Sequence, residues 1–247
     1  VAWLKMQVKT RLLYQYDSYL KEHEAAVVEV QGDLVYFDST IFHPRSGGVD
    51  HDKGFIEVSG KKLEVAEVFI DREKGDVAHR VPGVGGLGLE PGTRIKMVLN
   101  WERRYKLMRL HTAAHIVSAI MYNEYGALVS GGNITEEYAY DDYTLEKLDK
   151  ELFIKVIEKA NEVVRRDLEV KIYWLPREEA LRIPGVVKLA SRMPPEVSML
   201  RIVEIPGVDV QADGGPHVRR TSEIGEIVFL SAESKGKAKK RLYFTVK

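Results

Sequence analysis

Two histidines, followed much later by an aspartate and a third histidine, are the residues whose types and spacing could hold a metal ion. His111 and His115, in the segment HTAAH, are four residues apart in a stretch of helical character. Residues at i and i+4 project from one face of an α-helix, and paired imidazoles are common ligands of Zn²⁺. Taken alone, the pair is weak evidence, because a histidine in an amphipathic helix is more often an ordinary core or surface residue.

The second half of the predicted site is the segment ADGGPH, about a hundred residues further along the chain. Asp213 and His217 flank two glycines and a proline, so their spacing is not that of a helix. The alternative is a tight solvent-exposed turn in which the aspartate accepts backbone N–H groups. Together with His111 and His115, these residues predict either a tetrahedral Zn²⁺ site or a three-ligand site with an open position for water.

The composition limits the remaining chemistry. The 247 residues include no cysteine, which excludes thiolate ligands, a cysteine nucleophile and a disulfide framework. Lys and Arg total 37 and Asp and Glu total 37, so a nucleic-acid partner has to meet a local basic patch. No apolar run is long enough to span a membrane, and residues 1–10 do not have the apolar core of a signal peptide. We therefore expect a cytoplasmic protein with no membrane partner; the sequence does not predict its oligomeric state.

Hydrophobic periodicity predicts the elements that position these residues. Up to about residue 92, short apolar runs alternate with turn residues, which indicates a small β-barrel-like domain. Helices are predicted over 101–125, with Gly126 as C-cap, and over 144–166. Strand-like runs lie between and after these helices. The fold class is therefore predicted as α+β, with an N-terminal β domain over 1–92 and a two-layer α+β domain over 93–247, in which long helices cover a largely antiparallel sheet.

Several longer motifs agree with one known family. HTAAH followed by RIVEIPGVDVQADGGPHVRRTSEIGEIVFL resembles the paired zinc motifs of the alanyl-tRNA synthetase editing domain, H-T-x-x-H, then C-G-G-T-H-V and T-x-E-I-G. Upstream, LVYFDSTIFHPRSGGVDHDKGFI resembles the glycine-rich motif of that group, D-x-T-x-F-Y-P-x-S-G-G-Q-x-x-D-x-G. The resemblance covers nearly the whole chain, which has no aminoacylation domain. The chain is similar to the medium-sized, freestanding AlaX-type editing proteins.

The resemblance implies a zinc-dependent hydrolase that deacylates tRNA(Ala) mischarged with serine at the 3′-terminal adenosine, with glycine as a further candidate. It implies metal ligands at His111, His115, Asp213 and His217, with Asp213 standing where the family has cysteine. Carboxylate is a harder ligand than thiolate, so weaker and less selective zinc binding is expected. Val49 stands where the family has glutamine and preserves no polar chemistry.

Further roles follow from the same resemblance and from local charge. Thr40 corresponds to the family threonine credited with contacting the serine hydroxyl, although a strand-end threonine is a simpler interpretation. Gly47 and Gly48 are expected at the substrate because they permit a close backbone approach, or simply form a turn. The loop at Asp213, Gly214 and Gly215 is the predicted catalytic region. Basic clusters predict RNA contacts from Arg103, Arg104, Arg219, Lys237, Lys239 and Lys240.

Two alternatives stay open from the sequence. The chain could be an RNA-binding module that keeps the fold but is catalytically weakened by Val49 and Asp213. It could also be a metal-dependent hydrolase of another small acyl ester or amide.

Overall fold

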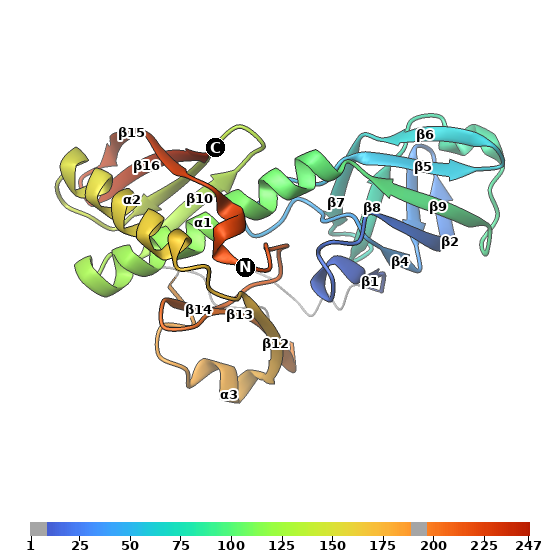
Figure 1. Ribbon diagram of the computed structural model, residues 1–247. Helices are drawn as coiled ribbons and strands as arrows, with labels where there is room; N and C mark the ends of the chain where they lie inside the picture. Colours follow the sequence, from blue (N-terminus) through green and yellow to red (C-terminus); the bar gives the residue numbers. More distant parts are fainter. Residues whose placement is uncertain (1–8, 189–196) are drawn as a thin grey trace. The chain divides into compact units, whose positions relative to one another are not determined.

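The chain divides into two compact units, Val1–Tyr105 and Lys106–Lys247, which we call unit 1 and unit 2 (Figure 1). The structure, a computed structural model, describes residues 9–188 and 197–247. Most of the segment inspected above for a signal peptide lies outside the described part. The predicted boundary after residue 92 stays a prediction.

Unit 1 is built mainly from one seven-stranded antiparallel sheet with the order β6-β5-β9-β2-β3-β8-β7. A short parallel pair, β1 with β4, and two 3₁₀ turns complete it. The elements are β1 Arg11–Leu12, η1 Leu13–Gln15, β2 Glu22–Gln31, β3 Leu34–Phe37, β4 Ser39–Thr40, β5 Gly54–Val58, β6 Lys61–Val65, β7 Glu67–Asp71, β8 Asp76–Arg80, η2 Val84–Leu87 and β9 Arg94–Leu99.

The long strand β2 joins the two halves of this sheet. Its first half, Glu22 to Ala26, pairs with β9, and its second half pairs with β3 after a register shift between Val27 and Glu29. Such a bulge bends a strand and increases its local twist. The side chains on the inner face, among them Phe37, Phe42 and Met97, form one buried cluster. The predicted β texture of this region is confirmed, whereas its barrel-like form stays a prediction, since no pair joins β6 to β7 among the described residues.

The predicted first helix is α1, Trp101–Tyr125. Its N-terminus is capped by Asn100, whose side-chain oxygen accepts the Arg103 N–H at 3.2 Å. Its C-terminus is closed by Gly126, which has a φ of +62° and donates its N–H to Tyr122 O at 3.0 Å. The expected C-cap is therefore confirmed, because glycine adopts this left-handed conformation without steric cost.

The second helix, α2, is shorter than predicted and spans Lys150–Arg165. The start predicted at residue 144 is wrong, because Asp149 caps the helix by accepting the Leu152 N–H at 3.0 Å. Asn161 in α2 exchanges hydrogen bonds of 2.8 Å with the backbone of Ile227, which fixes α2 to the first residue of β15.

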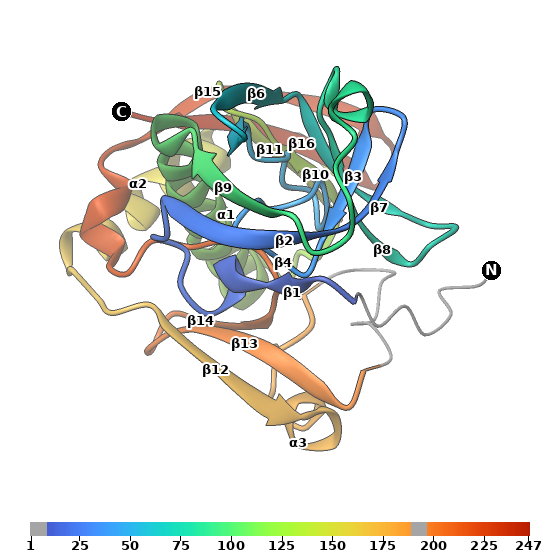
Figure 2. The same ribbon diagram turned by 90° about the vertical axis from the view of Figure 1, so that its right-hand side faces the viewer.

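Unit 2 contains two antiparallel sheets with orders β10-β11-β16-β15 and β12-β13-β14. The short helix α3 contacts β12 and β13, and Figures 1 and 2 both draw it at the end of these strands. The remaining elements are β10 Val129–Ile134, β11 Ala139–Tyr143, β12 Lys171–Pro176, α3 Arg177–Leu181, β13 Met199–Ile205, β14 Asp209–Ala212, η3 Thr221–Ile224, β15 Ile227–Gly236 and β16 Lys239–Val246. The predicted α+β class with mostly antiparallel sheets is confirmed. Among the described residues, no helix is long and apolar enough to cross a membrane.

Candidate metal centre

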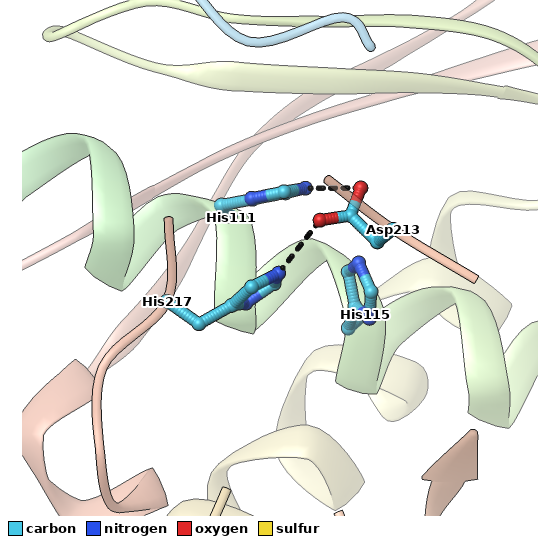
Figure 3. Close-up of side chains that lie close together, drawn as sticks. All are labelled: His111, His115, Asp213 and His217. Carbon is cyan, nitrogen blue, oxygen red and sulfur yellow. Dashed lines mark hydrogen bonds and ion pairs between the residues drawn. The ribbon is translucent and has the colours of Figure 1, made fainter. Parts of the chain in front are cut away.

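The four side chains predicted as metal ligands come together in unit 2 (Figure 3). His111 and His115 project from one face of α1, and Asp213 and His217 belong to the loop that follows β14. One potential ligand atom from each residue lies within 4.8 Å of all the others. The three imidazoles are almost fully buried, while Asp213 retains partial exposure.

Each imidazole uses its Nδ1 atom to bind a neighbouring oxygen, which leaves Nε2 for the centre of the cluster. The bonds are His111 Nδ1 to Pro216 O at 3.2 Å, His115 Nδ1 to Asp209 Oδ2 at 3.0 Å and His217 Nδ1 to Thr112 Oγ1 at 3.0 Å. Carbonyl and carboxylate oxygens only accept, and the Thr112 hydroxyl already donates its proton to Met108 O at 2.9 Å. All three rings are therefore assigned as the tautomer with the proton on Nδ1 and a lone pair on Nε2.

The inward-facing atoms are consequently all electron-pair donors. His217 Nε2 lies 3.1 Å from Asp213 Oδ2, and His111 Nε2 lies 3.6 Å from Asp213 Oδ1. Lone pairs at these distances repel unless a cation or proton lies between them. Three imidazoles and one carboxylate form a donor set suited to a divalent metal, with their outer nitrogens held as metal-ligating histidines usually are. The residues present therefore fit the expected metal ion.

The electrostatics favour the metal-binding protonation states. Burial, reinforced by the neighbouring His111 and His115, holds the pKa of His217 well below its usual value, so this ring is neutral at neutral pH. Burial opposes ionisation of Asp213, but positive charge on the neighbouring His111 and His217 outweighs burial and would hold its pKa well below the usual range, so the carboxylate is the form that faces a cation here. Neutral imidazole and ionised carboxylate are the forms that bind metals without first losing a proton.

Asp209 and Lys188 form a second buried layer that the sequence analysis missed. The Asp209 carboxylate accepts from His115 Nδ1, accepts from Gln211 Nε2 at 3.1 Å, and pairs with Lys188 Nζ at 2.6 Å. The Lys188 ammonium also donates to Gly185 O and Val210 O. Asp209, Gln211 and Asp213 alternate along an extended segment, and this period of two was the available signal. Nothing local in the sequence points to Lys188.

The loop itself is held by Arg201 of β13 and by close packing at Gly215. Arg201 Nη1 donates to Asp213 O and Gly215 O, both at 2.9 Å. The Gly215 N–H, in the loop predicted as the catalytic region, donates to Asp213 Oδ2 at 2.7 Å. A Cβ atom on residue 215 would lie 2.7 Å from His111 Cε1, which explains why glycine is needed here. Gly214 is exposed.

The predicted substrate residues lie in unit 1. Thr40 is fully buried, its hydroxyl lies 2.8 Å from His79 Nε2, and it accepts the Phe42 N–H at 3.1 Å. Gly47 and Gly48 have φ values of +61° and +85° and form the tight turn of a small hairpin between Ser46 and Val49. Val49 is buried in the core of unit 1.

The structure changes the interpretation of the basic residues. Arg103 and Arg104 are buried and bind Asp50 and Asp52, respectively, so they anchor the first turn of α1 and cannot reach a phosphate in this structure. Lys240 is also buried and donates to two backbone carbonyls of its own hairpin, those of Gly236 and Lys237. Lys239 pairs with Asp142 at 3.0 Å. Of the six predicted RNA contacts, Arg219 and Lys237 are exposed at the surface.

Comparison with known proteins places this geometry in context. The family described as threonyl and alanyl tRNA synthetase second additional domain matches residues 200–243, which include Asp213 and His217. The chain is 50% identical over 239 residues to the alanyl-tRNA editing protein AlaX-M of Saccharolobus solfataricus, covering 96% of this chain and 99% of that protein. It is 36% identical over 244 residues to the AlaX-M protein of Methanosarcina acetivorans, with the same coverage of both chains. It is also 38% identical over 237 residues to the alanine–tRNA ligase of Staphylothermus marinus, covering 94% of this chain but 25% of the ligase.

Proposed function

Because this chain belongs to the AlaX-M family of alanyl-tRNA editing proteins, we propose that it deacylates tRNA(Ala) mischarged with serine, and also with glycine, at the 3′-terminal adenosine ester. The observation that carries this proposal is the cluster of three imidazole Nε2 atoms and one carboxylate around a common point. It combines with a similarity that extends over almost the full length of the named editing proteins.

The chemistry of alanine selection explains why such an activity is needed. A pocket built for alanine cannot strongly exclude serine, which adds one hydroxyl, or glycine, which lacks one methyl group. A separate hydrolytic site can apply the opposite test, because a buried group that bonds the serine hydroxyl is left unpaired by alanine. The proposed substrates are therefore the errors that synthesis itself cannot remove efficiently.

The four clustered residues would hold a Zn²⁺ ion. When bound, zinc supplies a Lewis acid that can polarise the ester carbonyl or lower the pKa of a water molecule. His111, His115 and His217 present neutral Nε2 atoms, and Asp213 supplies the negative charge that partly balances the cation. Arg201 fixes the backbone of the Asp213 to Gly215 loop, so the carboxylate is held in place before substrate arrives.

Thr40 is the proposed contact for the serine side chain. His79 Nδ1 donates to Val35 O at 3.3 Å, so His79 Nε2 accepts the Thr40 proton, and one Thr40 lone pair accepts the Phe42 N–H. This geometry restricts what the Thr40 hydroxyl can recognise. The second lone pair can accept a hydrogen bond but cannot donate one. Thr40 would therefore favour a substrate that donates, as a serine hydroxyl does and an alanine methyl does not. Gly47 and Gly48 would allow the substrate to approach the backbone of their turn closely.

The proposal is tested by single-turnover deacylation of Ser-, Gly- and Ala-tRNA(Ala) with the full-length protein. Hydrolysis of the first two, with Ala-tRNA(Ala) much slower, is the expected result. Equal rates on serine and alanine would refute the selective editing function. Tight binding of uncharged tRNA without turnover would instead establish the RNA-binding module. Hydrolysis of a small seryl ester as fast as that of Ser-tRNA(Ala) would support a general esterase.

A further inference from the structure

Asp141 is a carboxyl group on a buried face of the β10-β11-β16-β15 sheet. It lies on β11 between Ala139 and Tyr143, and all three side chains are buried on the same face of the sheet. The Tyr143 ring lies 6.2 Å from the ring of Phe153 in α2, so this face is turned towards the helices. A buried carboxylate there is costly unless it is paired or used.

The neighbouring Asp142 shows what an ordinary structural carboxylate looks like in this sheet. Asp142 faces the opposite side and is paired with Arg241 at 2.7 Å and Lys239 at 3.0 Å. Asp141, in contrast, accepts one hydrogen bond, from Tyr143 Oη at 3.3 Å. Among the described residues, no lysine, arginine or histidine lies within ion-pair distance of it. The group is thus an acceptor without a cation.

The backbone opposite Asp141 is arranged to leave this carboxyl in place. Gly132 of β10 is its cross-strand partner, and a Cβ atom on residue 132 would overlap with Asp141 Oδ1. Gly131, one residue earlier, faces the other side, where a Cβ would lie 3.3 Å from Asp142 Oδ2. The segment SGGN therefore contains two glycines in different environments. Gly132 is the one whose missing side chain leaves room for the Asp141 carboxyl group.

Asp141 also lies within electrostatic range of the metal centre. Burial raises its pKa to about 7, and the nearby His115 acts in the opposite direction. A buried carboxyl with a raised pKa close to a cluster of ligating side chains is a candidate for direct contact with substrate. A cationic partner would restore its ordinary ionised state.

We propose that Asp141 binds the α-ammonium group of the aminoacyl ester, and that Gly132 and Tyr143 hold the carboxyl in position for that contact. This inference rests on the proposed function. An aminoacyl-tRNA carries a cation next to its ester carbonyl, and that cation is the partner which the carboxyl does not find in the protein. Recognition of the ammonium would select charged tRNA with a free amino group, whatever its side chain.

The test compares free and N-acetylated Ser-tRNA(Ala) in single-turnover deacylation by the wild-type protein and Asp141→Asn, which keeps the size of the side chain and the Tyr143 contact. For Ser-tRNA(Ala), kcat/KM should fall about 10–100-fold, as expected for loss of a charge-assisted hydrogen bond. The slower hydrolysis of N-acetylseryl-tRNA(Ala) should change less than threefold. Gly-tRNA(Ala), which also has a free ammonium, should lose as much as Ser-tRNA(Ala).

A second pair of variants keeps the carboxyl itself. Gly132→Ala, which displaces Asp141, should reproduce the selective loss on free-amine substrates, whereas Gly131→Ala should behave as wild type. An equal loss on free and acetylated substrates would show a structural role and overturn the proposal, as would an unchanged rate. A loss confined to serine would indicate a contact with the hydroxyl, which also overturns it. If the wild-type protein hydrolyses none of these tRNAs, the proposed function fails first.

Discussion

At the scale of single residues, the candidate metal centre depends on groups outside the proposed ligand set. Asp209 holds His115 through Nδ1 and is itself balanced by Lys188, so His115 has one fixed tautomer and orientation. Thr112 and Pro216 have the same function for His217 and His111. The centre is therefore pre-organised by ordinary hydrogen bonds whose acceptors could not be recognised from the two short motifs.

We predict that Asp209→Asn weakens zinc binding about 10–100-fold, the usual effect of removing a carboxylate that supports a ligating histidine. Asparagine keeps the shape but loses the negative charge that strengthens His115 as a donor. The affinity is measured by competition with a chromophoric chelator. Asp167→Asn, an exposed position paired with Arg220, serves as the control. Equal affinities for Asp209→Asn and wild type would show that Asp209 does not support the centre.

The hydrogen bonds of the Thr40 hydroxyl lead to a prediction for the free energy of unfolding that does not depend on substrate. Thr40→Val leaves His79 Nε2 and the Phe42 N–H buried without partners, which should cost roughly 1–3 kcal/mol for each group. Thr40→Ser restores the hydroxyl and should recover most of the loss. The free energy of unfolding is measured in urea, and Ser/Ala discrimination is measured on the same variants. A stable Thr40→Val protein with unchanged discrimination would leave Thr40 with neither role.

His79 gives unit 1 a predicted sensitivity to acid. Burial lowers the pKa of His79 to about 4, compared with 6.5 for an exposed histidine. The unfolded chain therefore binds more protons between these pH values, and stability is lost as pH falls from above 6.5 through 4. The expected loss is about 3 kcal/mol. Urea unfolding between pH 7.5 and pH 4 measures it, and His79→Gln should flatten the curve; an identical slope in that variant would contradict the assignment.

At the scale of elements, periodic segments were predicted well and segments fixed by distant partners were not. The helix α1 was predicted with its correct ends because its apolar pattern and Gly126 are local signals. The start of α2 was missed by several residues because one cap, Asp149, decides it. Short elements such as α3, β8 and β14 were not predicted, and β14 leads directly into the Asp213 loop.

Distant partners also explain why Arg103 and Arg104 were predicted as RNA contacts. In the sequence they stand within a basic helix start, but their carboxylate partners, Asp50 and Asp52, are about fifty residues away. In a sequence, a run of basic residues indicates an exposed basic patch, because carboxylate partners far along the chain are not recognised. By contrast, His111, His115, Asp213 and His217 could be grouped in advance, because two spacings and a chain order were enough to pair them.

The exposed members of the basic set carry the prediction for tRNA binding. Replacing Arg219 and Lys237 by alanine should weaken binding of tRNA(Ala) and reduce the slope of log K against log salt by up to about two phosphate contacts. Lys240→Ala should leave this slope unchanged, because the Lys240 ammonium binds carbonyls of its own hairpin. The slope is measured by filter binding at several salt concentrations. Equal slopes in the double variant and wild type would mean that these side chains are merely solvated.

At the scale of the whole molecule, the chain combines a β unit that holds the glycine-rich motif with an α+β unit that holds the metal centre. The net charge is zero, so no long-range positive field attracts RNA, and local contacts must provide the affinity. We propose that ester hydrolysis in this protein depends on a metal held by His111, His115, Asp213 and His217.

That claim is tested most directly by following Ser-tRNA(Ala) deacylation through one cycle of metal removal and return. The rate is measured on the purified protein, after chelation with metal loss verified by elemental analysis, and after addition of one equivalent of Zn²⁺. We expect that activity is lost with the metal and restored by zinc in wild type, and that His115→Ala is not restored. Full activity in protein shown to be free of metal would contradict it.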